Sequence, residues 1–161
     1  MCGLAGIAGR TAEKEQIRAA LRCVEHRGPD DHGVYEDSQL SLVHTRLSII
    51  DPSRAGHQPM KDEATGVVIA CNGEIYNYRE LRLGLDGEDF RSQSDTEVVL
   101  RLYLRHGITS INMLRGMFAL VIWDPRTRTL HLCRDRFGIK PLYYHHEGDV
   151  LAFSSEIKGL T

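Results

Sequence analysis

The second residue of the chain is a cysteine, and its position permits a chemistry that an internal cysteine does not have. The small residues Cys2 and Gly3 allow Met1 to be removed, which leaves an α-amine and a thiol on one residue. The amine has an unperturbed pKa of about 7.7 to 8.0, against about 8.5 for the thiol, so it can accept the thiol proton near neutral pH. The alternative is an unreactive cysteine in a buried first strand, a common environment for this residue.

The segment Cys71-Asn72-Gly73-Glu74 stands at the end of a strongly β-forming run. Acyl transfer needs donors aimed at a developing oxyanion, and an Asn side-chain amide beside a Gly backbone N–H can supply two of them. The same Asn-Gly dipeptide is typical of a tight turn. A turn does not require Glu74, so Asn72 and Gly73 are candidate oxyanion donors.

Two charged residues together indicate a binding site for a free amino acid. Arg46 lies within the apolar segment LVHTRLSII, where a buried guanidinium needs a partner. That partner is either a bidentate ligand carboxylate or a structural ion pair. Asp95 opens a predicted helix, where it either favours the positive helix end or binds an ammonium group. A carboxylate clamp with an ammonium clamp is the combination that a free amino acid requires.

These candidates must be positioned by strands and a few helices. Apolar or alternating runs predict strands at residues 2–9, 40–50, 66–71, 117–123, 129–133, 142–145 and 150–153. Residues 11–25 carry an apolar face at helical spacing, and residues 77–85 predict a short helix. Ser94 to Glu97 matches a capping box that opens a helix through His106, with Gly107 as its stop. Because strands outnumber helices and several are wholly apolar, we expect sheets buried between helices.

Composition and charge exclude several classes of protein. The 161 residues suit one domain, and 42% hydrophobic with 26% charged residues is ordinary for a soluble protein. The net charge of −2 argues against nucleic acid and membrane surfaces as partners. The cysteines show no CxxC spacing, which argues against a metal site and favours a reducing, cytoplasmic location. No apolar run approaches the length of a transmembrane helix.

Some polar residues receive a structural interpretation. His26, His44 and His57 stand in different segments without a recognisable partner spacing, so we treat them as structural. The run Arg134 to Pro141 predicts an ordered loop held by Arg–Asp pairs.

From these residues outward, the sequence closely resembles the N-terminal glutaminase domain of asparagine synthetases, which are class II glutamine amidotransferases with the N-terminal nucleophile hydrolase fold. The resemblance covers nearly the whole chain, in family order and spacing. It is carried by MCGLAGIAG, HRGPDDHG, HTRLSIID, CNGEIYN, SDTEV, LRGMFALVIWD, RDRFGIKPLYY and SSEIKGL. Within the amidotransferases, RGPD, NGEIYN and RFGIKPLYY resemble the asparagine-synthetase branch more than the sugar-phosphate or phosphoribosyl branches.

The resemblance implies an α+β fold, a four-layer αββα sandwich of two mostly antiparallel sheets. It implies Cys2 as nucleophile, with Asn72 and Gly73 as oxyanion donors. Arg46 would hold the α-carboxylate of glutamine, and Asp95 and Glu74 its α-amine. The implied pocket is completed by Leu47, Ser48, Ile49 and Ile50, with Asn77 bracing the Asn72 turn.

The implied reaction hydrolyses the glutamine side-chain amide through a Cys2 thioester, without a metal or other cofactor. In the family the ammonia passes to an ATP- and Mg-dependent synthetase domain with an SGGxDS-type phosphate loop. This chain stops at Thr161 and contains no such loop. We therefore expect residues 1–161 to be a single glutaminase domain, a fragment or one subunit of a split enzyme. Its expected partners are L-glutamine as substrate and a synthetase domain or subunit that receives the ammonia. Whether the protein forms a homodimer is left open.

Two other functions also stay open. A Cys/His thiol hydrolase acting on peptides would lose activity when a histidine is changed and would be indifferent to the N-terminus. A non-catalytic binding or regulatory domain with the same fold would bind glutamine without turnover, or not bind it.

Overall fold

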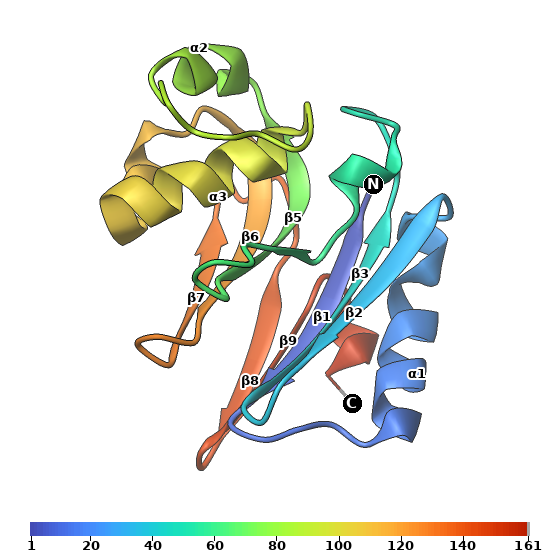
Figure 1. Cartoon of the computed structure of the whole chain (residues 1–161). Coiled ribbons are helices and arrows are strands. Elements are labelled where there is room, and N and C mark those ends of the chain that lie inside the picture. The colour runs from blue at the N-terminus through green and yellow to red at the C-terminus, as the bar shows by residue number, and fades with distance from the viewer. Residues whose placement is uncertain (161) are drawn as a thin grey trace.

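The computed structural model describes residues 1–160, and two antiparallel sheets form its centre (Figure 1). Thr161, the last residue of the predicted domain, lies outside the described residues. Sheet A has five strands in the order β2-β3-β1-β9-β8, and sheet B has four in the order β4-β5-β6-β7. The strands of sheet A are β1 (Gly3–Ala8), β2 (Asp31–Glu36), β3 (Leu40–Arg46), β8 (Tyr143–Glu147) and β9 (Val150–Ser154). Those of sheet B are β4 (Met60–Lys61), β5 (Val68–Ile75), β6 (Gly116–Asp124) and β7 (Thr129–Arg134).

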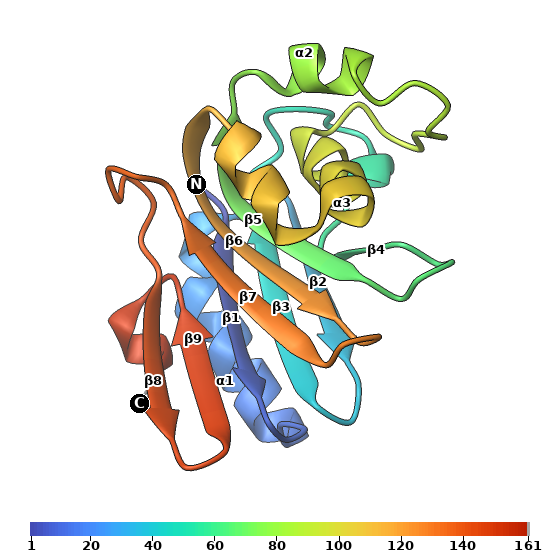
Figure 2. The same cartoon turned by 90° about the vertical axis from the view of Figure 1, so that its left-hand side faces the viewer.

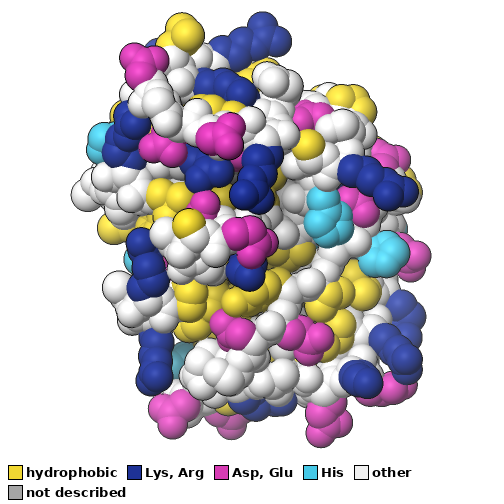
Figure 3. Space-filling model, in the orientation of Figure 1, with side chains coloured by type: hydrophobic (Ala, Val, Ile, Leu, Met, Phe, Trp, Pro, Cys, Tyr) yellow, Lys and Arg dark blue, Asp and Glu magenta, His cyan; other side chains and the backbone are white. Residues whose placement is uncertain are grey.

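Helices cover the outer faces of the two sheets. Helix α1 (Lys14–Val24) packs on sheet A and α3 (Asp95–His106) lies over sheet B, while α2 (Tyr78–Leu83) lies beside α3 beyond the end of β5, as Figures 1 and 2 show. Short 3-10 helices complete the chain at Glu25–Arg27, Arg54–Gly56, Gly107–Met113 and Ile157–Gly159. No helix within residues 1–160 is long and apolar enough to cross a bilayer. Figure 3 shows acidic and basic side chains interspersed over one face of the molecule rather than gathered by sign.

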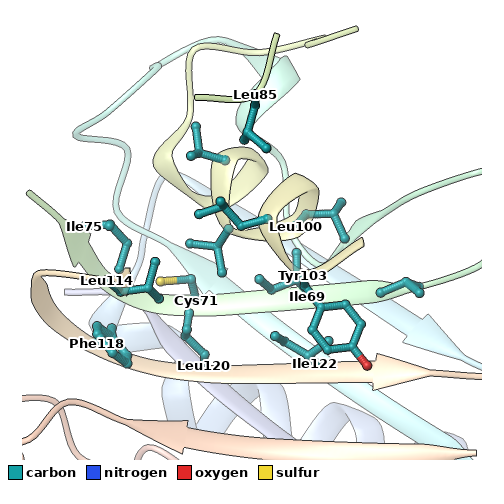
Figure 4. Close-up of a cluster of buried hydrophobic side chains, with 14 residues drawn as sticks. Ile69, Cys71, Ile75, Leu85, Leu100, Tyr103, Leu114, Phe118, Leu120 and Ile122 are labelled. Atoms are coloured by element: carbon teal, nitrogen blue, oxygen red, sulfur yellow. The ribbon is translucent and has the colours of Figure 1, made fainter. Parts of the chain in front are cut away.

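Three apolar clusters hold the layers together. Between the two sheets lie side chains such as Leu42, Val121 and Phe153. A second cluster joins sheet B to α3, where Cys71 lies among leucine and isoleucine side chains (Figure 4). A smaller third cluster joins sheet A to α1. The order helix, sheet, sheet, helix confirms the predicted αββα sandwich.

Alternation along the inner strands places polar residues at one end of the central layer. In β5, Val68 and Ala70 belong to the cluster between the sheets, so Asn72 continues the same face. In β1, Leu4 belongs to that cluster, so the preceding Cys2 lies on the inner side of sheet A. Both views of the chain place the N-terminus beside the end of β5 (Figures 1 and 2). The polar ends of the two inner faces therefore meet.

The structure corrects the predicted ends of two strands and the predicted burial of a third strand. Strand β3 ends at Arg46 rather than at Ile50, and β5 runs on to Ile75 instead of turning at Asn72-Gly73. The turn interpretation is wrong because Asn72 and Gly73 pair in register with Ala119 and Phe118 of β6. The expectation of sheets covered throughout by helices is wrong for β8, which is exposed along its whole length. It lies at the edge of sheet A, with a neighbour only in β9.

Helix α3 begins and ends where predicted, but its cap differs. Ser94 Oγ accepts a hydrogen bond from Thr96 N, and Gly107 ends the helix with a φ of 64°. Glu97 does not return to Ser94 as a capping box requires. Its carboxylate accepts hydrogen bonds from the backbone N–H groups of Arg91 and Ser92 instead. The capping box is therefore wrong, because this buried carboxylate is fully engaged by the preceding loop.

Candidate active site

The thiol of Cys2 lies against the loop that follows β3. Leu47 N donates to Cys2 Sγ at 3.4 Å. Burial is the main influence on the thiol and raises its pKa, although the Leu47 N–H, the positive N-terminus and Arg46 act in the opposite direction. The thiol is therefore protonated at neutral pH while Met1 is attached, and it needs a base to become a nucleophile.

Distant parts of the chain hold the backbone of Cys2. Arg27 Nε donates to the carbonyl oxygen of Cys2 at 3.0 Å, and Arg27 Nη1 pairs with Glu156 Oε1 at 2.6 Å. The Arg27 side chain is 8% exposed. Sequence reasoning missed this tether, although Arg27 belongs to the HRGPD segment that carried the resemblance.

Asn72 presents a side-chain amide that the protein leaves unused. The residue is 0% exposed, and neither Oδ1 nor Nδ2 has a hydrogen-bond partner among residues 1–160. Buried polar groups in native proteins nearly always have a partner, so an unpaired amide at a pocket indicates a place for a ligand atom.

The backbone N–H of Gly73 points to the same region. The N–H groups of Cys71 and Ile75 bond to Gln58 and Asp95, on the side of β5 away from β6. Because these directions alternate along an antiparallel strand, the N–H of Gly73 faces that side too. Gly73 and Asn72 both line the pocket, as the oxyanion assignment requires.

The guanidinium of Arg46 is hydrogen-bonded to the loop that follows β3. It donates to the carbonyl oxygens of Ser53, Ile50 and Asp51. These bonds leave two of the five guanidinium N–H donors, and within residues 1–160 the group makes no ion pair. The structural ion pair that was the alternative is therefore wrong. Arg46 shapes the pocket wall and retains donors for a ligand.

Asp95 and Glu74 supply negative charge to the same pocket. Asp95 is 5% exposed and accepts hydrogen bonds from Ile75 N and Thr96 N. Burial raises the pKa of the Asp95 carboxyl; the two N–H bonds lower it in part, and the Glu74 charge raises it further. Among residues 1–160 neither carboxylate has an ion-pair partner, so a ligand cation here would relieve an unfavourable charge.

These side chains line one open pocket of about 190 Å³. It brings together most of the predicted site residues, namely Cys2, Arg46, Leu47, Ile49, Ile50, Asn72, Gly73, Glu74 and Asp95. Residues that sequence reasoning did not assign to the site also line it, namely Met1, Gln58, Cys71, Ser94, Thr96, Met117 and Lys140. Within residues 1–160, no group of three or more His, Cys, Asp or Glu side chains is placed to hold a metal ion.

Two predicted residues do not line the pocket. Ser48 is absent from the pocket lining, and its backbone N–H donates to Asp30 Oδ2 at 2.7 Å. Asn77 does not brace Asn72, because there is no turn at that position. Its side chain instead donates to Met113 O and accepts from Arg115 N, which ties the start of α2 to the start of β6.

Lys140 was overlooked because it stands in a loop to which only packing was assigned. That loop is not held by Arg–Asp pairs. Asp135 accepts the N–H groups of its own loop, and Arg134 donates to the carbonyls of Gly138 and Lys140. Lys140 is 6% exposed, lines the pocket, and its ammonium bonds to no residue within 1–160.

The histidines lie outside this pocket. His44 is completely buried, and its Nε2 contacts the carbonyl oxygen of Cys71 at 3.0 Å. Burial lowers the pKa of His44 to about 4, although the contact with Cys71 opposes the change. His57 pairs with Asp31, and His26 with Glu156. This placement supports the structural interpretation, and within residues 1–160 no histidine lines the pocket that a Cys/His hydrolase would use.

Comparison with known proteins agrees with the geometry. A family model described as a glutamine amidotransferase domain matches residues 1–161. The glutamine-hydrolysing asparagine synthetase 2 of Bacillus subtilis is 42% identical over 166 residues, which cover 99% of this chain and 22% of that protein. A putative asparagine synthetase 2 of Methanocaldococcus jannaschii is 38% identical over 180 residues, or 35% of its length. The chain thus spans about a fifth to a third of these relatives.

A solved structure supports the fold. The glutamine phosphoribosylpyrophosphate amidotransferase from B. subtilis matches 98% of this chain and 42% of its own, with a TM-score of 0.82. The two are 24% identical, so this likeness establishes the fold alone. The predicted resemblance to the glutaminase region of asparagine synthetases is confirmed, and with its whole length matched, the chain belongs to the glutamine amidotransferase domain family.

Proposed function

We propose that residues 1–161 hydrolyse the side-chain amide of glutamine and supply the ammonia to an asparagine-synthetase-type amidation. One observation carries the proposal: the Asn72 amide is completely buried and unpaired in the same pocket as the Cys2 thiol. An unsatisfied buried polar group costs about 1–3 kcal/mol. A substrate oxygen that gains negative charge would satisfy it.

The chemistry follows from the groups present. Once Met1 is removed, the α-amine of Cys2 takes the thiol proton, and Sγ attacks the amide carbon of glutamine. Asn72 Nδ2 and Gly73 N stabilise the oxyanion. The proton passes to the leaving ammonia, and water then hydrolyses the glutamyl thioester to glutamate. Thiol, amine and amide donors supply nucleophile, base and oxyanion site, so we propose that the reaction needs no cofactor.

The two charged walls would select a free amino acid. Arg46, through its remaining donors, would bind the α-carboxylate, while Asp95 and Glu74 bind the α-ammonium. Asp95 is suited to this role because its raised pKa reflects a buried carboxylate that lacks a cation. The pocket walls Leu47, Ile49 and Ile50 would contact the methylene groups.

We also propose which kind of partner receives the ammonia. The asparagine synthetases that the chain resembles are three to five times its length. We therefore propose that an ATP- and Mg-dependent synthetase domain or subunit receives the ammonia, in the cytoplasm. Whether that partner is covalently attached, and whether the protein forms a homodimer, is separate from the glutaminase chemistry.

The experiment measures ammonia and glutamate release from glutamine by the purified protein with a processed N-terminus. Cys2→Ala should abolish release. Cys23→Ala is the matched control, because Cys23 lies on α1, outside the pocket, and should leave the rate unchanged. Undiminished release by Cys2→Ala, or an equal loss in Cys23→Ala, would refute the assignment of the nucleophile.

A further inference from the structure

Gln58 joins the two elements that carry the two halves of the site. Its Oε1 accepts a hydrogen bond of 2.7 Å from Cys71 N in β5, and its Nε2 donates one of 3.2 Å to Thr96 Oγ1 in α3. Cys71 directly precedes Asn72, and Thr96 directly follows Asp95. One side-chain amide therefore connects the oxyanion strand with the helix that bears the ammonium-binding carboxylate. Gln58 is itself 5% exposed and lines the pocket.

Strand β5 needs such a contact because it lacks a neighbouring strand at this point. Strand β4 pairs only with Val68 and Ile69. At Cys71, the backbone groups that face away from β6 are taken by side chains, the N–H by Gln58 and the carbonyl by His44. Elsewhere in a sheet a neighbouring strand would hold these groups in place. Asn72 itself pairs with Ala119 of β6, but on the side away from β6 the preceding residue is held by these two side chains.

We propose that Gln58 is a positioning residue for glutamine hydrolysis. Its bond to Cys71 N sets the place of the oxyanion donors Asn72 and Gly73, and its bond to Thr96 sets the place of Asp95. Small displacements of catalytic donors cost rate without abolishing binding, because the transition state is more sensitive to geometry than the substrate complex. This inference rests on the proposed function.

The two bonds can be separated by mutation. Gln58→Met keeps the side-chain length and removes both bonds, whereas Thr96→Val removes the bond to α3 and leaves the bond to Cys71 N in place. We expect Gln58→Met to lower kcat at least about tenfold, the factor that corresponds to one good hydrogen bond. Thr96→Val should mainly raise KM and keep kcat within about threefold. Gln39→Met is the matched control, since Gln39 is exposed and lies in the β2–β3 turn.

Two further measurements distinguish positioning from simple loss of structure. Rates are expressed per folded molecule, with the folded fraction measured by circular dichroism, so that unfolded protein does not contribute. Gln58→Glu retains an acceptor for Cys71 N–H and should recover most of the kcat lost in the Met variant. If Gln58→Met does not fold, Gln58→Glu is the folded test protein. It should keep slow exchange at Cys71 and a kcat within about threefold of the unmodified protein. A kcat about tenfold lower despite slow exchange at Cys71 would contradict the positioning role.

Amide hydrogen exchange at Cys71 gives a readout that needs no turnover. Gln58→Met should accelerate exchange at Cys71, and Thr96→Val should not. If the unmodified protein releases no ammonia, the proposed function fails, while exchange still shows whether Gln58 holds β5. An unchanged kcat per folded molecule in Gln58→Met, or unchanged exchange at Cys71, would overturn the positioning role.

Discussion

At the scale of single residues, the decisive atoms are those at the start of the chain. With Met1 attached, the nitrogen of Cys2 belongs to a peptide bond and cannot accept a proton. The thiol is then a partly buried group with a raised pKa. Removal of Met1 turns that nitrogen into an amine on the same residue as the thiol. The amine is both a base and, when protonated, a positive charge that stabilises the thiolate.

We therefore predict that a protein with a blocked N-terminus folds but does not hydrolyse glutamine. Cleavage of the block to expose Cys2 should restore ammonia release in the same sample. The restored rate should rise with pH through the range where amine and thiol titrate, about 7.7 to 8.5 from their unperturbed values. Equal rates before and after cleavage would rule out the α-amine as base.

Glu74 and Asp95 allow a second prediction at this scale. Binding of an ammonium group requires ionised Asp95, so KM for glutamine should rise as the pH falls through the pKa of Asp95. Burial, with help from Glu74, raises that pKa, so the rise should begin at a higher pH than an ordinary aspartate would give.

Glu74→Gln removes the neighbouring negative charge and should lower the pKa of Asp95. The acid limb of the KM profile should then move to lower pH, although KM itself is larger because one ammonium ligand is lost. The measurement is KM against pH for both proteins. An acid limb that stays in place or moves to higher pH would contradict the proposed coupling.

At the scale of elements, β5 is the strand that contributes both to the hydrophobic core and to the proposed active site. Its inward residues begin as core, with Val68 and Ala70, and end as the site, with Asn72 and Glu74. The strand lies close to β6 at this end. A Cβ on Gly73 would come within 2.1 Å of the carbonyl oxygen of Met117 and within 2.6 Å of Phe118 Cα. Both obstacles are backbone, which cannot rotate out of the way.

Gly73→Ala should therefore push β5 and β6 apart at the oxyanion site. We expect a loss of about 1–3 kcal/mol in the free energy of unfolding, together with a fall in kcat. Urea unfolding and ammonia release measure the two effects. Gly84→Ala is the control, because a Cβ there would meet only Leu81 O at 3.4 Å, an ordinary contact. Normal kcat in folded Gly73→Ala would show that the strand spacing does not matter for catalysis.

At the scale of the whole molecule, the two sheets are also tied at the end of β5 remote from the site. Asp37, in the β2–β3 turn of sheet A, accepts a hydrogen bond of 2.7 Å from Trp123 Nε1 in sheet B and one of 2.9 Å from Tyr35. Burial alone would raise the pKa of Asp37. The bonds from these side chains and from the N–H groups of Gln39 and Leu40 outweigh burial and lower it.

A lowered pKa in the folded state means that ionised Asp37 stabilises the fold above its unfolded pKa, and that this stabilisation is lost as pH falls through the folded pKa. Asp37→Asn should lower the free energy of unfolding by about 1–3 kcal/mol at neutral pH. The difference from the unmodified protein should shrink in acid below the ordinary aspartate value of 3.8. Urea unfolding followed by circular dichroism measures it. The same loss of unfolding free energy at both pH values would indicate that packing rather than charge is responsible. The variant's kcat should change little, because the active site lies at the other end of β5.

The sequence by itself determined the features that depend on neighbours along the chain. Alternating and apolar runs predicted every strand except β2 and β4, and helical spacing with Gly107 predicted α3 and its end. The order of the motifs predicted the family. Most of the site could also be predicted, because Cys2, Asn72 and Asp95 stand in such motifs.

Only the tertiary structure decided which residues meet. Arg27 reaches Cys2, and Gln58 reaches both Cys71 and Thr96, across separations that leave no periodic signal in the sequence. The turn that was the alternative interpretation of Asn72-Gly73 is wrong for the same reason: the local preference for a turn is overridden by pairing with β6, a strand more than 40 residues away. Local propensity is worth less free energy than the packing and hydrogen bonds of a sheet, so long-range contacts set the final geometry of the site.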